Sequence, residues 1–298
     1  WLKLCARVGS LLAAVRDDLL PSGRPASSSM GNLINTLAFP RPMYNRNFYE
    51  HTLLRRSDLV WLTTSKGERV PACHVRCRRG AAAAAKKTLL YSHGNAEDIG
   101  LHLAYIDLLA RELDVDVFSY EYVGYSLGRF EDPPQDPSEE GCTRSVDAAW
   151  RHCTDQLKIP PKDIVIFGRS IGSGPSVDLA SREVEGSQFS PLDVAGVLLQ
   201  SPIESGGRVA FGKAVSFMAY GLDIFRNYEK IDKIRAPCAI MHGTADEVVN
   251  VRNGHNLHGW LQKPFEPLWI EGYGHNDMPE DRCFEYSRKF LASLEQRK

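Results

Sequence analysis

The sequence predicts an α/β fold, in which a mostly parallel sheet lies between two layers of helices and an antiparallel hairpin precedes the parallel strands. Two observations predict it. From about residue 58, short apolar runs of strand length alternate with longer amphipathic stretches of helix length. Strands that alternate with helices run parallel, because each crossover helix returns the chain to the same edge of the sheet. We therefore expect a three-layer sandwich.

The predicted elements follow one another regularly along the chain. Residues 59–63 and 69–77 are expected to pair as the antiparallel hairpin, around a turn at 65–67. Buried strands are expected at 88–92, 116–122, 164–167, 194–199, 238–242 and 267–271. Helices are expected at 101–113, 137–157, 175–184, 251–261 and 279–294.

The helix expected at 137–157 has a defined start in the sequence. Asp136 is predicted to be its N-terminal cap, and Pro137 suits the first helical position. Glu139 is placed to reach back to the backbone N–H of the cap, which completes a capping box.

The composition excludes several classes of protein. The chain of 298 residues has 36 Lys and Arg against 37 Asp and Glu, a formal net charge of -1. A nucleic-acid binder normally has a basic excess, so we expect no nucleic-acid partner. The apolar stretch 11–20 is interrupted by charged residues, so no membrane-spanning helix is expected. We divide the chain into an N-terminal segment, 1–57, expected to be partly non-native or flexible, and one domain, 58–298.

The seven cysteines are scattered, and we expect them to be reduced thiols in the cytoplasm rather than a disulfide framework. Cys73, His74 and Cys77 could supply half of a zinc site. No second Cys or His pair follows at a ligand-like spacing, and the segment alternates like a strand. We therefore expect no metal site.

A serine nucleophile of this fold class sits in a G-x-S-x-G turn between a strand and a helix, and the sequence contains that pattern twice. Residues 168–172 follow the strand at 164–167 directly and lead into a helix, with Ser170 at the centre. Residues 124–128, centred on Ser126, run instead into a stretch with two consecutive prolines and no helical periodicity. Ser170 is therefore the predicted nucleophile, and Ser126 is expected to be a loop serine near the rim of the site.

The nucleophile needs a base, and the base needs an acceptor that fixes its tautomer; in this fold the chain order is Ser, acid, His. Asp246 follows the strand at 238–242 and is the predicted acid, in preference to Glu247, which should face another way. His275 lies in the short loop Gly272-Tyr273-Gly274-His275 after the last strand and is the predicted general base. All three residues would then lie at one edge of the sheet.

The reaction also needs donors for the oxyanion. The strand at 88–92 ends in His93-Gly94-Asn95, and the glycine allows the next backbone amide to turn inward. The backbone N–H groups of Asn95 and Ile171 are the predicted oxyanion hole. His93 is expected to be structural and to hold this loop by hydrogen bonds.

Several motifs together resemble one family. They are YSHGNAEDIG (91–100), YEYVGYS (120–126), FGRSIGSGP (167–175), HGTADEVV (242–249) and GYGHND (272–277). From about residue 77 to the C-terminus the chain resembles the alpha/beta hydrolase domain-containing protein 17 family. The resemblance implies an α/β hydrolase fold and a serine hydrolase whose catalytic residues are Ser170, Asp246 and His275. It further implies that the substrates are S-palmitoylated proteins, from whose cysteines palmitate is removed. Acyl transfer by these residues requires no cofactor, so none is expected.

Two other functions stay open at this stage. The same residues would serve a carboxylesterase, lipase or peptidase acting on small substrates. A scaffold without catalytic activity is the alternative from another class, and the complete set of catalytic residues speaks against it.

The stretch 202–235 is the candidate insertion over the site. It is rich in aromatic residues, and we expect some of its side chains to line an acyl groove. The alternative is a helix packed on the body of the fold. The candidate lining residues are Phe211, Phe217, Met218 and Phe225.

The N-terminal segment departs from the family pattern. Animal members begin with a cluster of acylated cysteines, whereas this chain has only Cys5 in its first 70 residues. Met30 and Gly31 resemble a start site with N-myristoylation at Gly31, and residues 1–29 are expected to lie outside the mature fold. One myristoyl chain gives only marginal binding, so a second signal would be needed. The expected location is the cytoplasm, with peripheral contact to the cytosolic face of membranes.

Overall fold

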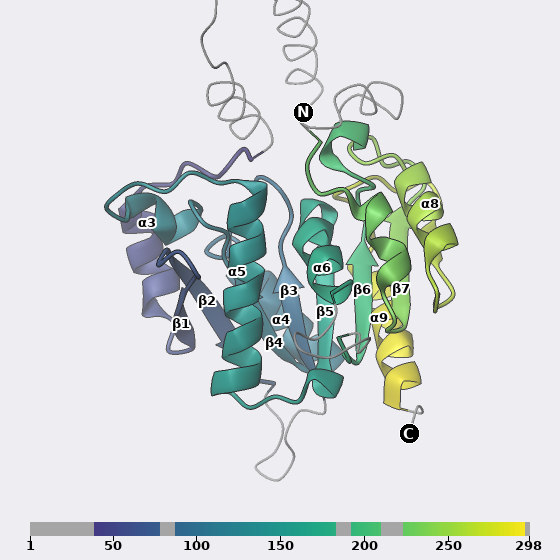
Figure 1. Cartoon of the computed structure of the whole chain (residues 1–298), viewed down its shortest axis with the longest axis horizontal. Coiled ribbons are helices and arrows are strands. Elements are labelled where there is room, and N and C mark those ends of the chain that lie inside the picture. The colour runs from purple at the N-terminus through teal and green to yellow at the C-terminus, as the bar shows by residue number, and fades with distance from the viewer. Residues whose placement is uncertain (1–38, 78–86, 183–191, 210–222, 296–298) are drawn as a thin grey trace, which may run out of the picture.

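The computed structural model describes residues 39–77, 87–182, 192–209 and 223–295. The strands in this part of the chain are β1 (Leu59–Thr63), β2 (Arg69–Val75), β3 (Thr88–Ser92), β4 (Asp116–Tyr120), β5 (Ile164–Arg169), β6 (Gly196–Gln200), β7 (Cys238–Gly243) and β8 (Leu268–Ile270). They form one sheet in the order β1-β2-β4-β3-β5-β6-β7-β8 (Figure 1). The pairs β1–β2 and β2–β4 are antiparallel and the remaining pairs are parallel, so the predicted fold class is confirmed.

Helices cover both faces of this sheet (Figure 1). On one face lie α5 (Glu139–Arg151), α6 (Ser173–Ala180) and α8 (Arg252–Trp260). On the other face lie α4 (Leu103–Leu113) and α9 (Glu280–Glu295). The crossovers place the carboxyl ends of the parallel strands along one edge of the sheet, where the loops that carry the candidate site begin.

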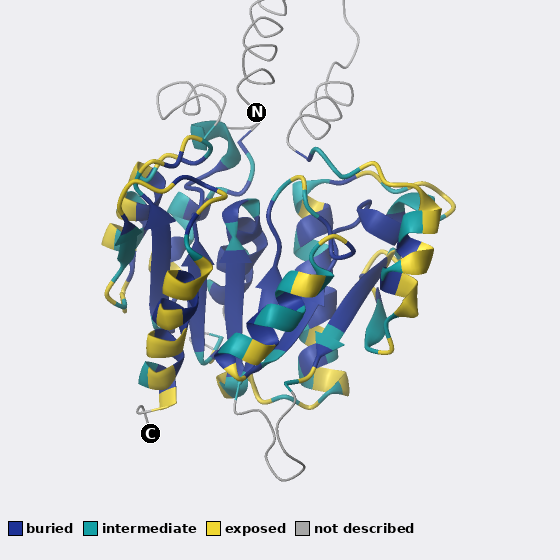
Figure 2. Cartoon of the chain, turned by 180° about the vertical axis from the view of Figure 1, so that it is seen from behind, coloured by how far each residue is buried: buried dark blue, intermediate teal, exposed yellow. Residues whose placement is uncertain are grey.

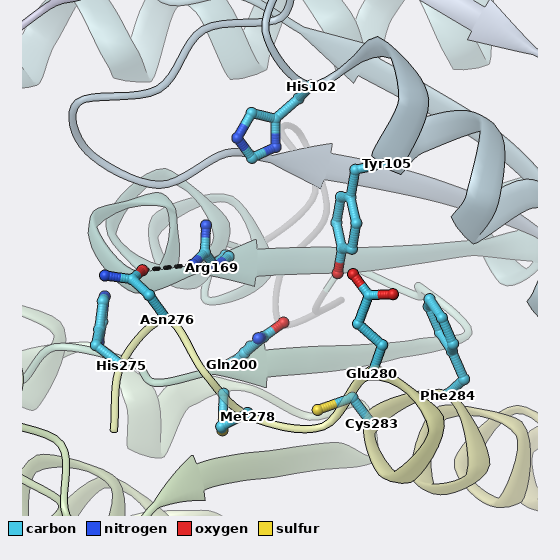
Figure 3. Close-up of a pocket in the computed structure, with 10 residues that line it drawn as sticks. All are labelled: His102, Tyr105, Arg169, Gln200, His275, Asn276, Met278, Glu280, Cys283 and Phe284. Carbon is cyan, nitrogen blue, oxygen red and sulfur yellow. Dashed lines mark hydrogen bonds between the residues drawn. The ribbon is translucent and has the colours of Figure 1, made fainter. Parts of the chain in front are cut away.

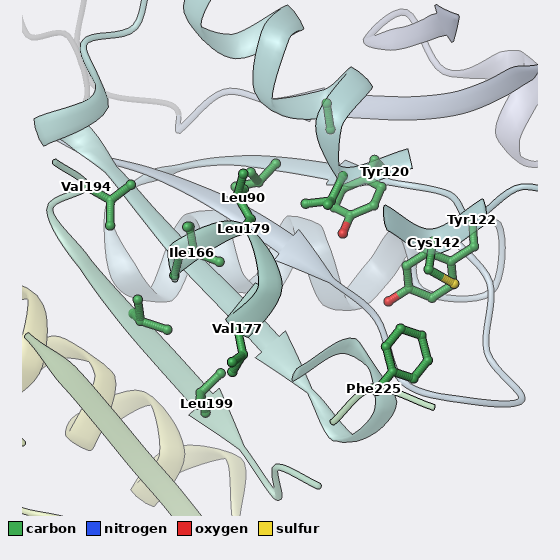
Figure 4. Packing of buried hydrophobic residues seen from close by; sticks show 14 of the residues in the cluster. Leu90, Tyr120, Tyr122, Cys142, Ile166, Val177, Leu179, Val194, Leu199 and Phe225 are labelled. Carbon is green, nitrogen blue, oxygen red and sulfur yellow. The ribbon is translucent and has the colours of Figure 1, made fainter. Parts of the chain in front are cut away.

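The sheet is buried between the helices (Figure 2). Every residue of β3, β6 and β7 is buried, as central parallel strands covered on both faces require. Successive side chains point to opposite faces: Leu90 and Leu199 join the cluster under α5 and α6, shown in Figure 4, whereas Leu89 and Leu198 join the cluster under α4 and α9. The strand ends are thus held by two apolar layers.

The start of α5 differs from the prediction. The helix begins at Glu139, and its N-terminal cap is Ser138, whose hydroxyl accepts from the backbone N–H of Gly141 at 3.0 Å. Asp136 lies outside the helix and pairs with Arg41 at 3.4 Å. The Glu139 carboxylate accepts from the backbone N–H of Phe225 at 2.9 Å rather than from a cap amide. Tertiary partners have therefore replaced the predicted capping box.

The described end of the N-terminal segment packs on the domain. α3 (Arg46–His51) buries Tyr49, and Phe39 and Leu53 are also buried. The hydroxyl of Tyr49 donates to Asp98 at 2.6 Å, next to the loop that follows β3. These residues belong to the two main hydrophobic clusters, which the sequence boundary at residue 58 did not anticipate.

Two general features concern the described residues only. None of their helices has the length and apolar character needed to cross a bilayer. Their cysteines are free thiols, and most of them are buried. Cys73 lies within β2 with its side chain in the core, as the strand interpretation of this segment predicts.

Candidate active site

Ser170 occupies a strained turn directly after β5. Its φ is 53°, in the left-handed region that residues other than glycine rarely adopt. The glycines on either side make the turn possible, because a Cβ at Gly168 would lie 2.6 Å from the Ser176 hydroxyl and one at Gly172 would lie 2.3 Å from the carbonyl oxygen of Ser92. The chain then continues through a 3₁₀ turn into α6. This is the strand-turn-helix context predicted for the nucleophile.

The predicted residues Ser170, Asp246 and His275 meet at one edge of the sheet. His275 follows Ser170 by 105 residues and Asp246 by 29 residues. The Nε2 atom of His275 lies 3.0 Å from the Oγ atom of Ser170. The Nδ1 atom of the same ring lies 2.7 Å from the Oδ2 atom of Asp246. All three side chains are buried. The arrangement fixes one tautomer, in which Nδ1–H donates to the carboxylate and Nε2 can accept the serine proton.

The loop after β7 holds the Asp246 carboxylate on both oxygens. Oδ1 accepts from the backbone N–H groups of Val248 and Val249 at 2.9 and 2.7 Å. Burial opposes ionisation, but hydrogen bonds from His242 and His275 outweigh it and hold the pKa of Asp246 well below its usual range. Glu247 is exposed, which agrees with the choice of Asp246 as the acid.

A second histidine on this carboxylate was not predicted. His242, at the end of β7, is fully buried, and its Nε2 atom lies 3.1 Å from Asp246 Oδ2 and 2.8 Å from the carbonyl oxygen of Val249. Both neighbours are acceptors, so Nε2 carries the proton. Nδ1 has no hydrogen-bond partner among the described residues and faces Gly254, where a Cβ would approach it to 2.7 Å. His242 therefore donates its Nε2–H to the same carboxylate oxygen that accepts from His275.

The predicted oxyanion loop lies against the turn that holds Ser170. β3 and β5 are neighbours, with Ser92 opposite Gly168, so Asn95 and Ile171 follow adjacent strand ends. Tyr122 donates to the carbonyl oxygen of His93 at 2.7 Å, and Tyr125 donates to the side-chain oxygen of Asn95 at 3.3 Å. The two backbone amides predicted to bind the oxyanion are thus placed on loops in direct contact.

His93 has the structural role that was predicted. It is fully buried, with Nε2 at 2.8 Å from Glu121 and Nδ1 at 2.9 Å from the carbonyl oxygen of Gly94. Burial opposes its protonation, but the Glu121 charge and hydrogen bond raise the pKa of His93 above its ordinary value. The contact between His93 and Glu121 fastens the predicted oxyanion loop to the end of β4.

Arg169 is a second residue that the sequence did not single out. Its guanidinium pairs with Glu97 on the loop after β3, and its Nη2 atom donates to the side-chain oxygen of Asn276 at 2.9 Å (Figure 3). Burial opposes ionisation of Glu97, but a hydrogen bond from His102 and the charge of Arg169 lower its pKa to about 2. Arg169 therefore ties the oxyanion loop to the loop that carries His275.

The remaining predicted residues have different positions. Phe211, Phe217 and Met218 lie outside the described residues, as does Gly31. Phe225 is 2% exposed and stacks edge-on with Phe39 at 5.9 Å between ring centroids. A Cβ at Gly174 would lie 2.2 Å from the Phe225 ring, so this ring packs on α6 as a core residue, and its burial does not support a place in an acyl groove.

Ser126, the centre of the second G-x-S-x-G pattern, makes no hydrogen bond with His275 or Asp246. Its side chain is fully buried, and its Oγ atom has no hydrogen-bond partner among the described residues. It begins a 3₁₀ helix, Ser126–Phe130, rather than an α-helix. A buried hydroxyl without a base cannot act as a nucleophile, so Ser170 is the serine that the structure presents.

Comparison with known sequences gives close relatives. The chain is 41% identical over 232 residues to alpha/beta hydrolase domain-containing protein 17B of Xenopus laevis, covering 77% of this chain and 73% of the relative. The human protein 17B is 40% identical over 215 residues, 72% of this chain and 68% of the relative. Protein 17C of Mus musculus is 35% identical over 248 residues, 83% of this chain and 69% of the relative. No family model matches the chain.

Comparison with solved structures supports the fold. An alpha-beta hydrolase from Vibrio vulnificus superposes with a TM-score of 0.60 at 15% identity, covering 92% of this chain and 95% of the other. The esterase RhEst1 from Rhodococcus sp. ECU1013 superposes with a TM-score of 0.54 at 18% identity, covering 80% of this chain and 99% of the other. At such identities the likeness concerns the fold alone.

Proposed function

The chain belongs to the alpha/beta hydrolase domain-containing protein 17 family, and from this premise we propose that it is a serine hydrolase that cleaves thioesters. The single observation that carries the proposal is the hydrogen-bonded line from Ser170 through His275 to Asp246, with distances of 3.0 and 2.7 Å. A strained, activated serine beside two backbone amides is the arrangement that acyl transfer requires. The chain is thus a hydrolase, and we assign its covalent catalysis to the groups at this edge of the sheet.

The first half of the reaction acylates the enzyme. His275 Nε2 accepts the proton of Ser170 as Oγ attacks the acyl carbonyl carbon, and Asp246 stabilises the imidazolium that forms. The developing oxyanion is bound by the backbone N–H groups of Asn95 and Ile171. The tetrahedral intermediate then collapses, the bond to the leaving group breaks, and His275 returns its proton to the departing thiolate or alkoxide.

The second half releases the acid. A water molecule gives its proton to His275 and attacks the acyl-serine carbonyl, and the same two amides bind the second oxyanion. Collapse of this intermediate returns the proton to Ser170 Oγ and frees the fatty acid. Each step uses only side chains and backbone groups of the chain and water.

The proposed substrates are S-palmitoylated proteins at the cytosolic face of membranes, and family membership supports this choice. The substrates would carry their acyl group into the membrane surface, so a peripheral contact of the enzyme with that surface fits the reaction. Lipidation at Gly31 remains the proposed source of this contact, together with a second signal.

An esterase acting on small oxygen esters is the second candidate. The fold of esterase RhEst1, and of the other esterases that this chain resembles, favours it, because the catalytic residues serve oxygen esters and thioesters alike. The two candidates differ in the leaving group alone, so substrates with the same acyl chain separate them.

The test is release of labelled palmitate from S-acylated membrane proteins. We expect wild-type protein to release it, and Ser170→Ala to lose about 10⁴-fold or more of the activity. Ser126→Ala is the matched control, because it removes the hydroxyl of the other G-x-S-x-G turn; its activity should be retained. Release by the Ser170→Ala variant would contradict the proposed nucleophile, and hydrolysis of small oxygen esters without any palmitate release would favour the second candidate.

A further inference from the structure

An open pocket of about 210 Å³ lies beside His275 at the carboxyl edge of the sheet (Figure 3). It is bounded by the ends of β5 and β6 and by the beginnings of α4 and α9. The residues that matter for its chemistry are Arg169, Gln200, Met278, Glu280, Cys283 and Phe284. His275 is the one lining residue that takes part in the reaction steps described above.

Its position identifies the part of the substrate that it can reach. Met278 and Phe284 belong to the hydrophobic cluster on the face of α4 and α9. The described ends of the 202–235 insertion, Ile203 and Phe225, belong to the cluster on the opposite face. The pocket and the described residues of this insertion, 202–209 and 223–235, therefore lie on opposite sides of the sheet edge that carries Ser170. Because His275 lines the pocket and must protonate the leaving group, the pocket is on the leaving-group side.

One polar group in the pocket has an unmet hydrogen-bonding requirement. Gln200 ends β6 and is 8% exposed, and its Oε1 atom has no hydrogen-bond partner among the described residues. Figure 3 shows its side-chain amide directed into the pocket toward Tyr105 and Glu280. Buried acceptors are normally satisfied, so this oxygen favours a ligand that brings an N–H donor.

The charges in the pocket favour a cation. The guanidinium of Arg169 is already neutralised by its ion pair with Glu97. Glu280 is exposed at the start of α9, and no ion pair joins it to another of the described residues. Glu280 is the one carboxylate among the residues that line the pocket. The side chains of Met278, Cys283 and Phe284 add apolar surface to the lining.

We propose that this pocket binds a lysine or arginine side chain of the substrate polypeptide, on the cysteine side of the thioester. A long basic side chain buries its aliphatic stem against apolar surface and directs its charged end to a polar group. Here the stem would contact Met278 and Phe284, and the N–H groups would meet Gln200 and Glu280. The volume is below the roughly 300–1,000 Å³ of sites for drug-sized ligands, which suits one side chain. This inference rests on the proposed thioesterase function and adds the substrate preference.

The test compares synthetic peptides that carry one S-octanoyl cysteine. One series has lysine at each position within three residues of the cysteine, and the matched series has norleucine, which keeps the stem and removes the charge. For wild-type protein we expect lysine at one of these positions to raise kcat/KM by about three- to fivefold, the size of a partly exposed ion pair. In Glu280→Gln the lysine-to-norleucine ratio should fall to about one.

Two further variants test whether the preference for lysine depends on the charge of Glu280. Glu285→Gln makes the same substitution on the same helix at a position that does not line the pocket, and it should keep the wild-type ratio. Glu280→Lys should prefer glutamate to lysine at the same peptide position. A ratio of one in wild-type protein, or an unchanged ratio in Glu280→Gln, overturns the pocket assignment. Failure of the thioesterase function is a separate result, recognised when wild-type protein cleaves the thioester of neither the lysine series nor the norleucine series.

Discussion

At the scale of single residues, the chemistry depends on how the Asp246 carboxylate is held. Two backbone N–H groups fix one oxygen, and the rings of His242 and His275 share the other. These donors lower the pKa of Asp246, so the group stays ionised throughout the neutral range and can stabilise the imidazolium of His275. The carboxylate therefore acts by orientation and charge and keeps no proton of its own.

Replacement of the acid tests this role directly. Asp246→Asn keeps the shape of the side chain but removes its charge, so it no longer stabilises the imidazolium or enforces the Nδ1–H tautomer. We expect kcat to fall by about 10⁴-fold with little change in KM. Steady-state kinetics on an acyl thioester measure kcat and KM. Glu247→Gln is the control, because it removes the charge of the neighbouring carboxylate. Near-wild-type kcat in Asp246→Asn would mean that another group is the acid.

His242 gives a second prediction at this scale. His242→Phe keeps an aromatic ring in the core but removes the N–H that donates to Asp246 at 3.1 Å. A hydrogen bond to a charged group contributes about 1.5–3 kcal/mol, so kcat/KM should fall roughly 10- to 100-fold, less than in Asp246→Asn. Parallel kinetics of the two variants measure the difference. Unaltered kcat/KM in a folded His242→Phe protein would limit this histidine to packing.

The sequence predicts the catalytic residues better than the residues that support them. Ser170, Asp246 and His275 each stand in a short motif directly after a strand, so chain order and strand position suffice to find them. His242 and Arg169 are found only through contacts. His242 precedes Asp246 by four residues at the end of a strand, a spacing that could have indicated the contact, whereas the partners of Arg169 lie on loops 72 and 107 residues away.

At the scale of elements, the site depends on the close approach of the β3 loop to the turn after β5. The carbonyl oxygens of Ser92 and His93 occupy the space where a side chain at Gly172 would stand, at 2.3 and 2.5 Å from a Cβ. This contact sets the distance between the two loops that carry the oxyanion donors. The spacing of the catalytic groups is thus determined by backbone packing.

Gly172→Ala tests that contact. The added methyl group must push the two loops apart, so we expect a loss of about 1–3 kcal/mol in the free energy of unfolding and a lower kcat. Gly259→Ala is the matched control, because this glycine of α8 has nothing within 4 Å of its Cβ position. There the substitution should stabilise the helix by up to about 1 kcal/mol. Urea unfolding of both variants measures the two changes in stability. Equal stability of the two variants would contradict the close approach of the β3 loop to the turn after β5.

The start of α5 shows where local sequence patterns fail to predict an element boundary. The predicted capping box at Asp136, Pro137 and Glu139 is wrong, although its pattern is correct locally. Both carboxylates have tertiary partners, Arg41 for Asp136 and the Phe225 backbone for Glu139, and Ser138 takes the cap instead. Local propensity is a weak prior where distant groups compete for the same side chain.

At the scale of the whole molecule, a buried hydrogen bond and a half-buried ion pair connect the loops of the site to the body of the fold. His93 with Glu121 anchors the oxyanion loop, and Arg169 with Glu97 joins that loop to the one that carries His275. The pKa of Glu97 is lowered from 4.5 to about 2. Because this group's pKa is lower in the folded chain, its stabilising contribution is present above about pH 4.5 and is lost as the pH falls through about 2.

Wild-type protein and Glu97→Gln should differ in stability by an amount that depends on pH. Near pH 7 the variant should be less stable by about 1–3 kcal/mol, because the half-buried guanidinium of Arg169 loses its counter-charge. The difference should narrow as the pH falls below 4.5, where wild-type Glu97 begins to bind a proton. Denaturant unfolding from pH 7 down to the acid limit measures it. A difference that stays constant with pH would assign the loss to packing alone.

The sequence predicts the overall architecture, but it does not predict how residues 39–57 pack on the domain. Alternating strand-length and helix-length runs predict the parallel sheet, because the crossover connection leaves no other direction for the strands. No periodic pattern marks residues 39–57, yet Tyr49 is fully buried there and donates to Asp98. A single helix of six residues has too few apolar positions to reveal the face that packs.

The most direct test of the central claim is the site and rate of labelling by a fluorophosphonate, which reacts with an activated serine. In wild-type protein, mass spectrometry of the digested adduct should find the probe on Ser170. His275→Ala should slow the labelling by several orders of magnitude while the protein stays folded, because the serine then lacks its base. A probe found on another serine, or an unchanged labelling rate in His275→Ala, would contradict the proposed catalytic arrangement.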